Sequence, residues 1–98
     1  MEKRKAHYPL DRVKELARQN NVRVTKTAST NSAHLGFDFE AIKETVILLE
    51  PGDLYKSMTA YANATVWHDV YRFPSVVGVI YLKLQIIDDL LIISFKEL

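Results

Sequence analysis

Four side chains in the second half of the chain could together act on a phosphodiester: Lys56, His68, Tyr81 and Lys96. The two ammonium groups could stabilise a charged phosphorane, and the phenol could donate to the phosphate or carry a proton. An imidazole has an ordinary pKa of about 6.5 and can exchange a proton near neutrality. Because RNA carries its own nucleophile, the ribose 2′-hydroxyl, this set of groups indicates RNA cleavage without a metal.

A lysine is the alternative general base for such a reaction. Its ordinary pKa of about 10.4 would have to be lowered by burial or by a second cation. The residue types alone therefore leave both His68 and a lysine open as the group that transfers the proton.

The residues that position these groups alternate between apolar and polar, which is typical of strands. The clearest alternation runs through residues 76–87, where Leu82 and Leu84 point toward the core. Tyr81 and Lys83 point to the opposite face. The same pattern predicts three or four strands, over about residues 54–61, 65–73, 76–87 and 90–97.

The register of the last hairpin follows from a predicted two-residue turn at residues 88–89. This turn pairs Leu84 with Ile93, so that apolar residues of both strands face the core. It also places Tyr81 opposite Lys96 on the other face.

The neighbouring hairpins extend this arrangement into a row. A turn at residues 74–75 places His68 opposite Tyr81, and a loop around Ala62 sets Lys56 against His68. Directly opposed residues lie about 5 Å apart, so adjacent side chains could act on one small group. The predicted row on the sheet face away from the helices is Lys56–His68–Tyr81–Lys96.

One residue conflicts with this register. Asp69 falls on the core face, between Trp67 and Tyr71. A carboxylate there requires a buried hydrogen-bonding partner, a bulge or a different register.

Helical spacing dominates the first half of the chain. Residues 9–18 predict an amphipathic helix, and residues 22–25 predict a short strand. Thr27 is expected to cap a weak second helix that ends before Gly36, and Asp38 to cap a third helix. The expected buried stripe of the third helix is Phe39, Ile42, Val46 and Leu49.

These elements predict an α+β fold, with about three N-terminal helices packed on one face of a twisted, mainly antiparallel sheet. A chain of 98 residues without a linker is expected to form a single domain, residues 1–98. The chain has no cysteine, and its three histidines are too far apart for a local metal motif. No apolar run is long enough to cross a membrane, and no signal sequence is recognisable, so a cytoplasmic location is expected.

The net charge of +1 conceals an uneven distribution. Residues 1–26 hold eight Lys and Arg against three Asp and Glu, whereas residues 27–54 hold one against five. Residues 55–98 are balanced at four against four. A basic leading segment could guide a phosphate polymer, although a solvated helix face would have the same composition.

Two other interpretations of the predicted row remain open. Lysine, tyrosine and histidine are ordinary residues on a solvated sheet face, so the chain could be a structural subunit. It could also be a non-catalytic RNA-binding or regulatory module that uses the same face. Incubation of the protein with RNA distinguishes these two interpretations from an enzyme, because only an enzyme cleaves the RNA.

Five segments resemble the MqsR toxins of bacterial type II toxin–antitoxin systems, at the length and spacing of that family. They extend from the first residues to the last, so the resemblance covers the whole chain. The segments are MEKR at 1–4, LGFDF at 35–39, DLYKSMT at 53–59, WHDVYR at 67–72 and SFKE at 94–97.

The resemblance implies a RelE-like fold and a metal-independent endoribonuclease, an mRNA interferase, that cuts mRNA at short sequences and uses no cofactor. It also implies inhibition by an MqsA-like antitoxin, with a zinc-binding N-terminal part and a helix-turn-helix part that binds DNA. An exposed edge strand, such as residues 22–25, is a natural place for a partner to dock by strand addition.

The catalytic positions of the family correspond in type to Lys56, Tyr81 and Lys96. At the remaining position the family commonly has glutamine, and this chain has His68. Either His68 is a titratable base, or it keeps the hydrogen-bonding role of glutamine while a lysine or tyrosine transfers the proton. The neighbours expected to bind RNA are Arg72, Tyr55 and Met58.

Overall fold

Three helices form in the first half of the chain in the computed structural model, which describes residues 1–98. The third helix begins at its expected cap, because the Asp38 carboxylate accepts a hydrogen bond from the Ala41 backbone N–H at 2.8 Å. The expected cap at Thr27 is wrong. Thr25 caps that helix instead, since its hydroxyl accepts from the Ala28 backbone N–H at 3.1 Å. The helices are α1 (Leu10–Arg18), α2 (Lys26–His34) and α3 (Phe39–Leu48).

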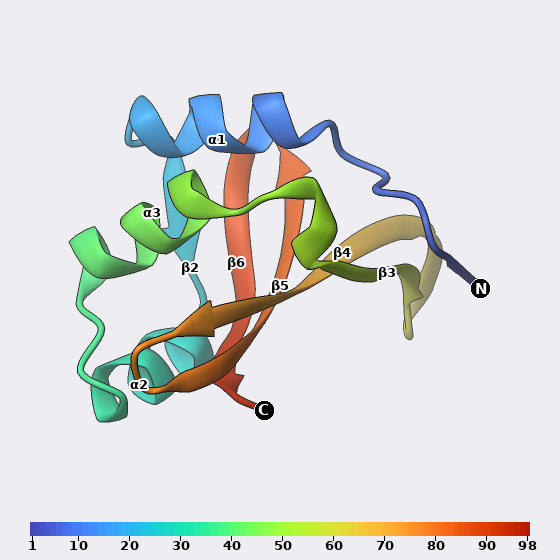
Figure 1. The fold of residues 1–98 in the computed structure, drawn as a ribbon. Helices are drawn as coiled ribbons and strands as arrows, with labels where there is room; N and C mark the ends of the chain where they lie inside the picture. The colour runs from blue at the N-terminus through green and yellow to red at the C-terminus, as the bar shows by residue number, and fades with distance from the viewer.

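Six strands form one sheet in the order β1-β3-β4-β5-β6-β2 (Figure 1). All neighbours are antiparallel except β2, which runs parallel to β6 at one edge. The fold is α+β, as expected, but the helices do not simply precede the strands, because β1 comes before α1 and β2 separates α1 from α2. The strands are β1 (Glu2–Lys3), β2 (Val22–Val24), β3 (Leu54–Ala60), β4 (Asn63–Ser75), β5 (Gly78–Ile87) and β6 (Asp89–Glu97), with a short 3₁₀ turn, η1 (Pro51–Asp53), before β3.

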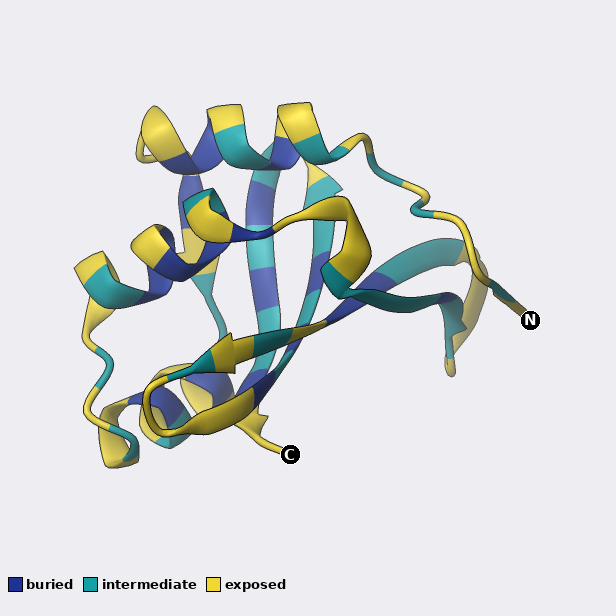
Figure 2. Ribbon diagram, viewed as in Figure 1, coloured by how far each residue is buried: buried dark blue, intermediate teal, exposed yellow.

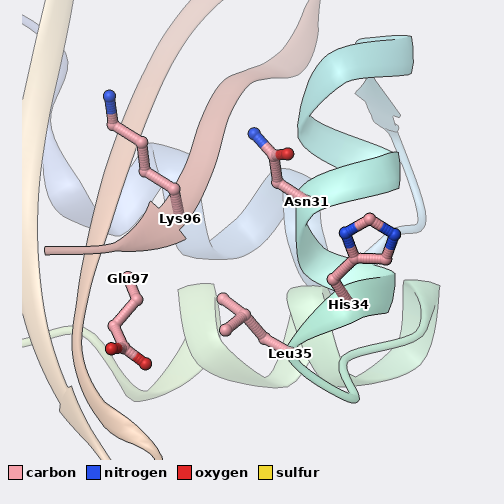
Figure 3. Close-up of a pocket in the computed structure, with 5 residues that line it drawn as sticks. All are labelled: Asn31, His34, Leu35, Lys96 and Glu97. Carbon is pink, nitrogen blue, oxygen red and sulfur yellow. The ribbon is translucent and has the colours of Figure 1, made fainter.

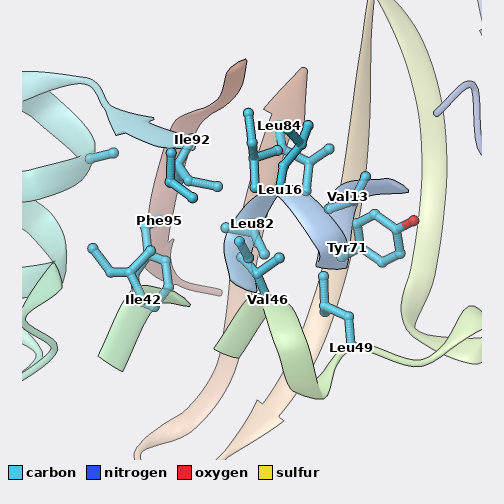
Figure 4. Packing of buried hydrophobic residues seen from close by; sticks show 14 of the residues in the cluster. Val13, Leu16, Ile42, Val46, Leu49, Tyr71, Leu82, Leu84, Ile92 and Phe95 are labelled. Atoms are coloured by element: carbon cyan, nitrogen blue, oxygen red, sulfur yellow. The ribbon is translucent and has the colours of Figure 1, made fainter. Parts of the chain in front are cut away.

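One hydrophobic core joins the helices to the sheet, and Figure 2 shows the buried positions along the elements that face it. Figure 4 shows how side chains from α1 and α3 meet those of β4, β5 and β6. The expected α3 stripe is right except for Phe39, which is 43% exposed. The largest fully buried side chains are Tyr71, Phe95, Leu16, Leu49, Ile80, Leu82, Leu84, Leu90 and Ile92.

Near Tyr81 the β5–β6 hairpin has the predicted register, although its turn is not the predicted one. Tyr81 lies opposite Lys96, as predicted, but Leu84 lies opposite Ile92 rather than Ile93. The turn uses the single residue Asp88, at φ 63°, and a register shift beside Ile93 then restores the predicted pairing. As a result Ile92, not Ile93, is fully buried.

The β4–β5 hairpin turns two residues later than predicted, at residues 76–77, and this shifts the pairing of the two strands by four residues. Ser75 pairs with Gly78, and the Ser75 hydroxyl donates to the Gly78 carbonyl at 2.6 Å. Gly78 has φ 116°, a conformation that glycine adopts without strain, so the glycine and not Pro74 locates the turn. Arg72 consequently lies opposite Tyr81, and the predicted pairing of His68 with Tyr81 is wrong.

The β3–β4 hairpin is also shifted, by two residues. Met58 lies opposite His68, and Lys56 lies opposite Val70. Both registers are shifted by an even number of residues. Every residue of these strands therefore stays on the expected face of the sheet, while its cross-strand neighbours change. Of the predicted row, only the contact between Tyr81 and Lys96 survives.

The N-terminal segment supplies the buried partner that Asp69 requires. The Asp69 side chain is 0% exposed and accepts hydrogen bonds from the backbone N–H groups of His7 and Tyr8, at 3.0 and 2.9 Å. The Tyr8 hydroxyl donates to the Trp67 carbonyl at 2.7 Å. These hydrogen bonds hold the segment before α1 against β4.

Replacing Asp69 by alanine should therefore destabilise the protein. Two backbone donors would lose their acceptor in a part-buried place, at a cost of about 1–3 kcal/mol each at most. Chemical denaturation of Asp69→Ala measures the loss of unfolding free energy. Glu44→Ala, on the exposed side of α3, is the matched control and should change the unfolding free energy by less than about 0.5 kcal/mol. Equal stability of the two variants would contradict this role for Asp69.

Candidate functional site

The sheet face opposite the core gathers most of the polar residues singled out in the sequence. Strand pairing arranges them in three adjacent cross-strand rows, about 7 Å apart along the strands. We call the charged part of this surface the cationic face, defined by Lys56, Arg72, Tyr81, Lys83 and Lys96. The rows are Arg72–Tyr81–Lys96, then Lys56–Val70–Lys83–Ser94, then Met58–His68 extended by Gln85.

Tyr81 and Lys96 form the contact that the sequence predicted. The Lys96 ammonium lies 5.2 Å from the centroid of the Tyr81 ring, and Arg72 lies opposite Tyr81 on its other side. A phosphate placed over Tyr81 would therefore have the Lys96 ammonium beside it, with Arg72 on the neighbouring strand. Lys56 belongs to the next row rather than to the same one.

His68 is separated from Tyr81 in the structure. It is four residues from Arg72 along β4, about 13 Å away. Its Nε2 atom is 2.9 Å from the side-chain oxygen of Gln85, and it is half-buried. Burial lowers the pKa of His68, so the imidazole is mainly neutral at pH 7. This geometry suits a hydrogen-bonding residue at the edge of the cationic face.

Lys56 is held by a partner that the sequence did not suggest. Glu2, on β1, forms an ion pair with the Lys56 ammonium. The hydrogen bond with the Glu2 carboxylate raises the pKa of Lys56, and the same bond lowers the pKa of Glu2. Lys56 is therefore a persistently charged group, suited to electrostatic stabilisation rather than to proton transfer.

The pKa of Lys83 is shifted in the opposite direction from that of Lys56. It lies in the middle row opposite Val70, which is 0% exposed yet lies outside the main core, so the lysine stems of this row help to cover it. Burial lowers the pKa of Lys83, and repulsion from Lys96 and then Lys56 lowers it further. A lysine in this setting can lose its proton more readily than an ordinary one.

Aromatic and cationic side chains extend the site along β3. The Arg72 guanidinium lies over the Tyr55 ring, 3.6 Å from its centroid. The Arg4 guanidinium is 5.8 Å from the same ring and donates to the Tyr55 carbonyl at 3.5 Å. Guanidinium planes and aromatic rings are surfaces on which unpaired RNA bases stack. The basic N-terminal segment thus reaches the cationic face.

Two residues of this site were missed by sequence reasoning. Lys83 was detectable, because the alternation that places Tyr81 on this face places Lys83 there as well. Glu2 was not, because its partner Lys56 lies 54 residues away and no local pattern joins them. The structure brings together no group of three or more metal-binding side chains. No helix is both long enough and apolar enough to cross a membrane.

Comparison with known proteins identifies similar chains over nearly the whole length. A family model described as "Motility quorum-sensing regulator, toxin of MqsA" matches residues 5–97. The chain is also 47% identical over 97 residues to the mRNA interferase toxin MqsR of Escherichia coli (strain K12), and the match covers 99% of each chain. Both matches include the complete cationic face.

The crowding of cations around Lys83 can be measured directly by NMR titration of the lysine side chains. Lys83 should titrate below the ordinary value of about 10.4. Lys96→Met and Lys56→Met should each raise the pKa of Lys83, because each removes a positive neighbour and so favours the protonated form.

The matched control is Lys26→Met, at the exposed start of α2, which should leave the titration of Lys83 unchanged. If Lys83 has an ordinary pKa that does not change in Lys96→Met, burial and neighbouring cations do not lower its pKa and this assignment is wrong.

Proposed function

Since the chain belongs to the MqsR toxin family, we propose that it is an mRNA interferase, an endoribonuclease that cuts mRNA at short sequences. The observation that carries the proposal is the cationic face itself, with three cations free of ion pairs, Arg72, Lys83 and Lys96, beside one tyrosine. A polyanion with its own nucleophile is the substrate that such a surface fits. The relative that is 47% identical carries the name mRNA interferase toxin.

The proposed reaction is transesterification by the ribose 2′-hydroxyl, without a metal. The 2′-oxygen forms a bond to phosphorus while the bond from phosphorus to the 5′-oxygen breaks. The proton of the 2′-hydroxyl passes to a base, and the 5′-oxygen takes a proton from an acid. The products are a 2′,3′-cyclic phosphate and a 5′-hydroxyl.

The side chains of the cationic face divide these tasks according to their charge. Lys83 in its neutral form accepts the 2′-hydroxyl proton, because it is the lysine whose pKa is lowered. Lys56, whose pKa is raised by its hydrogen bond with Glu2, and Lys96 stabilise the phosphorane. Tyr81, in contact with Lys96 and opposite Arg72 in the strand pairing, donates to the phosphate and carries the proton to the leaving oxygen.

His68 takes a binding role in this proposal. Its distance from Tyr81 and its hydrogen bond with Gln85 support an amide-like function over that of the general base. Met58, directly opposite His68, and the stacked pair of Tyr55 and Arg72 extend the surface along which the RNA strand binds.

Family membership and the sheet topology also support finer proposals. The three helices and the sheet adopt the RelE-like arrangement, with the helices on one face of the sheet. The activity is held in check by an MqsA-like antitoxin that has a zinc-binding part and a helix-turn-helix part that binds DNA. The edge strand β2 offers backbone groups to which such a partner could add a strand. An mRNA substrate would be met in the cytoplasm.

Cleavage of RNA in the presence of EDTA tests the proposed function. The wild-type protein should cut defined RNA and leave 2′,3′-cyclic phosphate ends, detected by end mapping on a mixed substrate. Lys56→Ala, Lys83→Met and Lys96→Ala should each reduce the cleavage rate by about a hundredfold or more, as the loss of one transition-state contact does. Lys83→Met keeps the apolar stem over Val70.

The control for these variants is Lys26→Ala, which should cleave at the wild-type rate. Thermal melting of each variant separates lost catalysis from lost folding. Full cleavage by both Lys56→Ala and Lys96→Ala would show that the site is wrongly assigned. Retention of RNA without cleavage by the wild-type protein would favour a non-catalytic RNA-binding module.

The pH–rate profile of His68→Gln tests the assignment of the base. The variant keeps a side chain able to bond Gln85, so most of the activity should remain and any rise in rate near pH 6–7 should persist. Loss of that rise in His68→Gln would show that the imidazole is its source, and would overturn the role given to Lys83.

A further inference from the structure

One carboxylate contacts the cationic face, and it comes from the other end of the chain. Of the four cations of this face only Lys56 forms an ion pair, and its partner is Glu2 on β1. A surface that binds a polyanion is expected to exclude acidic side chains, because they repel phosphate groups. Attraction of RNA therefore does not explain why this ion pair is present.

The acidic residues nearest to this face in sequence are directed away from it. Glu97 follows Lys96 but pairs with the buried Ile80, and Figure 3 shows the Lys96 and Glu97 side chains leaving the end of β6 in opposite directions. Asp69 lies on the core face of β4 and binds backbone N–H groups there. The carboxylate of Glu2 is thus brought to the face by a separate strand.

The direction of Lys56 is set by an irregularity in β3. Leu54 pairs with Tyr71 and Lys56 pairs with Val70, so Tyr55 is an extra residue without a partner on β4. A β-bulge of this kind re-aims the side chains next to it. Leu54 accordingly packs against the core, whereas Lys56 lies on the opposite face, with its ammonium 5.3 Å from the centroid of the Tyr55 ring.

Glu2 belongs to a part of the backbone that is fixed against the same strand. The pairing of β1 with β3 places Glu2 opposite Met58, two residues beyond Lys56 and on the same face. Next to this pair, the Met1 carbonyl accepts a hydrogen bond from the Thr59 backbone N–H at 2.9 Å. A carboxylate on this strand can therefore hold the end of a flexible side chain in one place.

We propose that Glu2 is a positioning residue of the ribonuclease, and that its carboxylate holds the Lys56 ammonium where it meets the phosphate. The inference rests on the proposed ribonuclease function and adds a residue to it. A lysine has a flexible four-carbon stem, and ordering this stem costs free energy. Because Glu2 orders it before RNA binds, the cost does not fall on the reaction.

The ion pair leaves Lys56 able to bind a phosphate at the same time. An ammonium group has three N–H donors, so a contact with one Glu2 oxygen leaves the others for phosphate oxygens. The Lys56 side chain is also 21% exposed, so Glu2 does not close it off from solvent. An inhibitory carboxylate, by contrast, would have to leave the lysine before a phosphate could bind.

Steady-state cleavage of RNA by Glu2→Gln tests the inference. An amide holds an ammonium less firmly than a carboxylate does, so kcat should fall by about tenfold. KM should not rise, since a negative charge is removed from a face that binds a polyanion. Glu2→Asp keeps the carboxylate on a shorter stem and should retain more activity than Glu2→Gln.

The matched control is Glu15→Gln, which makes the same change in net charge. Glu15 is an exposed acid on α1 that forms an ion pair with Arg18, away from the cationic face. This variant should cleave RNA with the kcat and KM of the wild-type protein. A general effect of net charge on RNA binding would appear equally in both variants.

A double-mutant cycle with Lys56→Ala shows whether Glu2 acts through that lysine. In the Lys56→Ala background, Glu2→Gln should leave kcat unchanged, because the group that Glu2 positions is absent. A further loss of similar size in that background would show that Glu2 acts on the fold or on another group, and would overturn the inference. Thermal melting of each variant accompanies the cycle.

The remaining outcomes separate this inference from the proposed function. If Lys56→Ala slows cleavage while Glu2→Gln keeps the wild-type kcat or exceeds it, the nuclease assignment stands and the positioning role alone is wrong. If the wild-type protein cleaves no RNA, both are wrong. An equal pKa of Lys56 in the wild-type protein and Glu2→Gln, measured by NMR titration, would also overturn the role, because the hydrogen bond with Glu2 raises that pKa.

Discussion

One buried carboxylate connects the fold to the candidate site. Asp69 lies on the core face of β4, where an unpaired charge would be costly, and the backbone N–H groups of His7 and Tyr8 bind it there. Because these two residues are fixed, the chain before them runs beside β3 and brings Glu2 to Lys56. The chain after them enters α1 over the core. Neither the start of the helical layer nor the ion pair of Lys56 is independent of this contact.

The regular parts of the structure could be predicted from sequence because they follow from periodicity and local capping. Alternation placed Tyr81 and Lys83 on one face, and helical spacing identified the buried side of α1. The turns could not be placed in the same way. Pro74 is typical of a turn, but Gly78 can take a positive φ, and this sets the position of the turn. As a result the cross-strand neighbour of Tyr81 is Arg72 and not His68.

The charge state of each lysine was beyond prediction for a different reason. The required feature was recognisable in advance, namely a lysine whose pKa is lowered by burial and by a second cation. Which lysine has the lowered pKa depends on contacts between segments that are distant in the sequence. Glu2 raises the pKa of Lys56, whereas Lys83 meets only burial and two like charges. The presence or absence of one carboxylate neighbour thus shifts the pKa values of two lysines on the same face in opposite directions.

The crowding of positive charge on the cationic face has opposite consequences before and after substrate binds. In the free protein, Lys56 and Lys96 disfavour a proton on Lys83, so its neutral form is more available. A phosphate bound among these residues supplies negative charge and reverses the effect, and the charge that develops on a phosphorane reverses it further. Under the proposed mechanism, Lys83 therefore becomes a stronger base as the 2′-oxygen attacks. Stabilisation of this kind is greater in the transition state than in the free enzyme, which is the condition for catalysis.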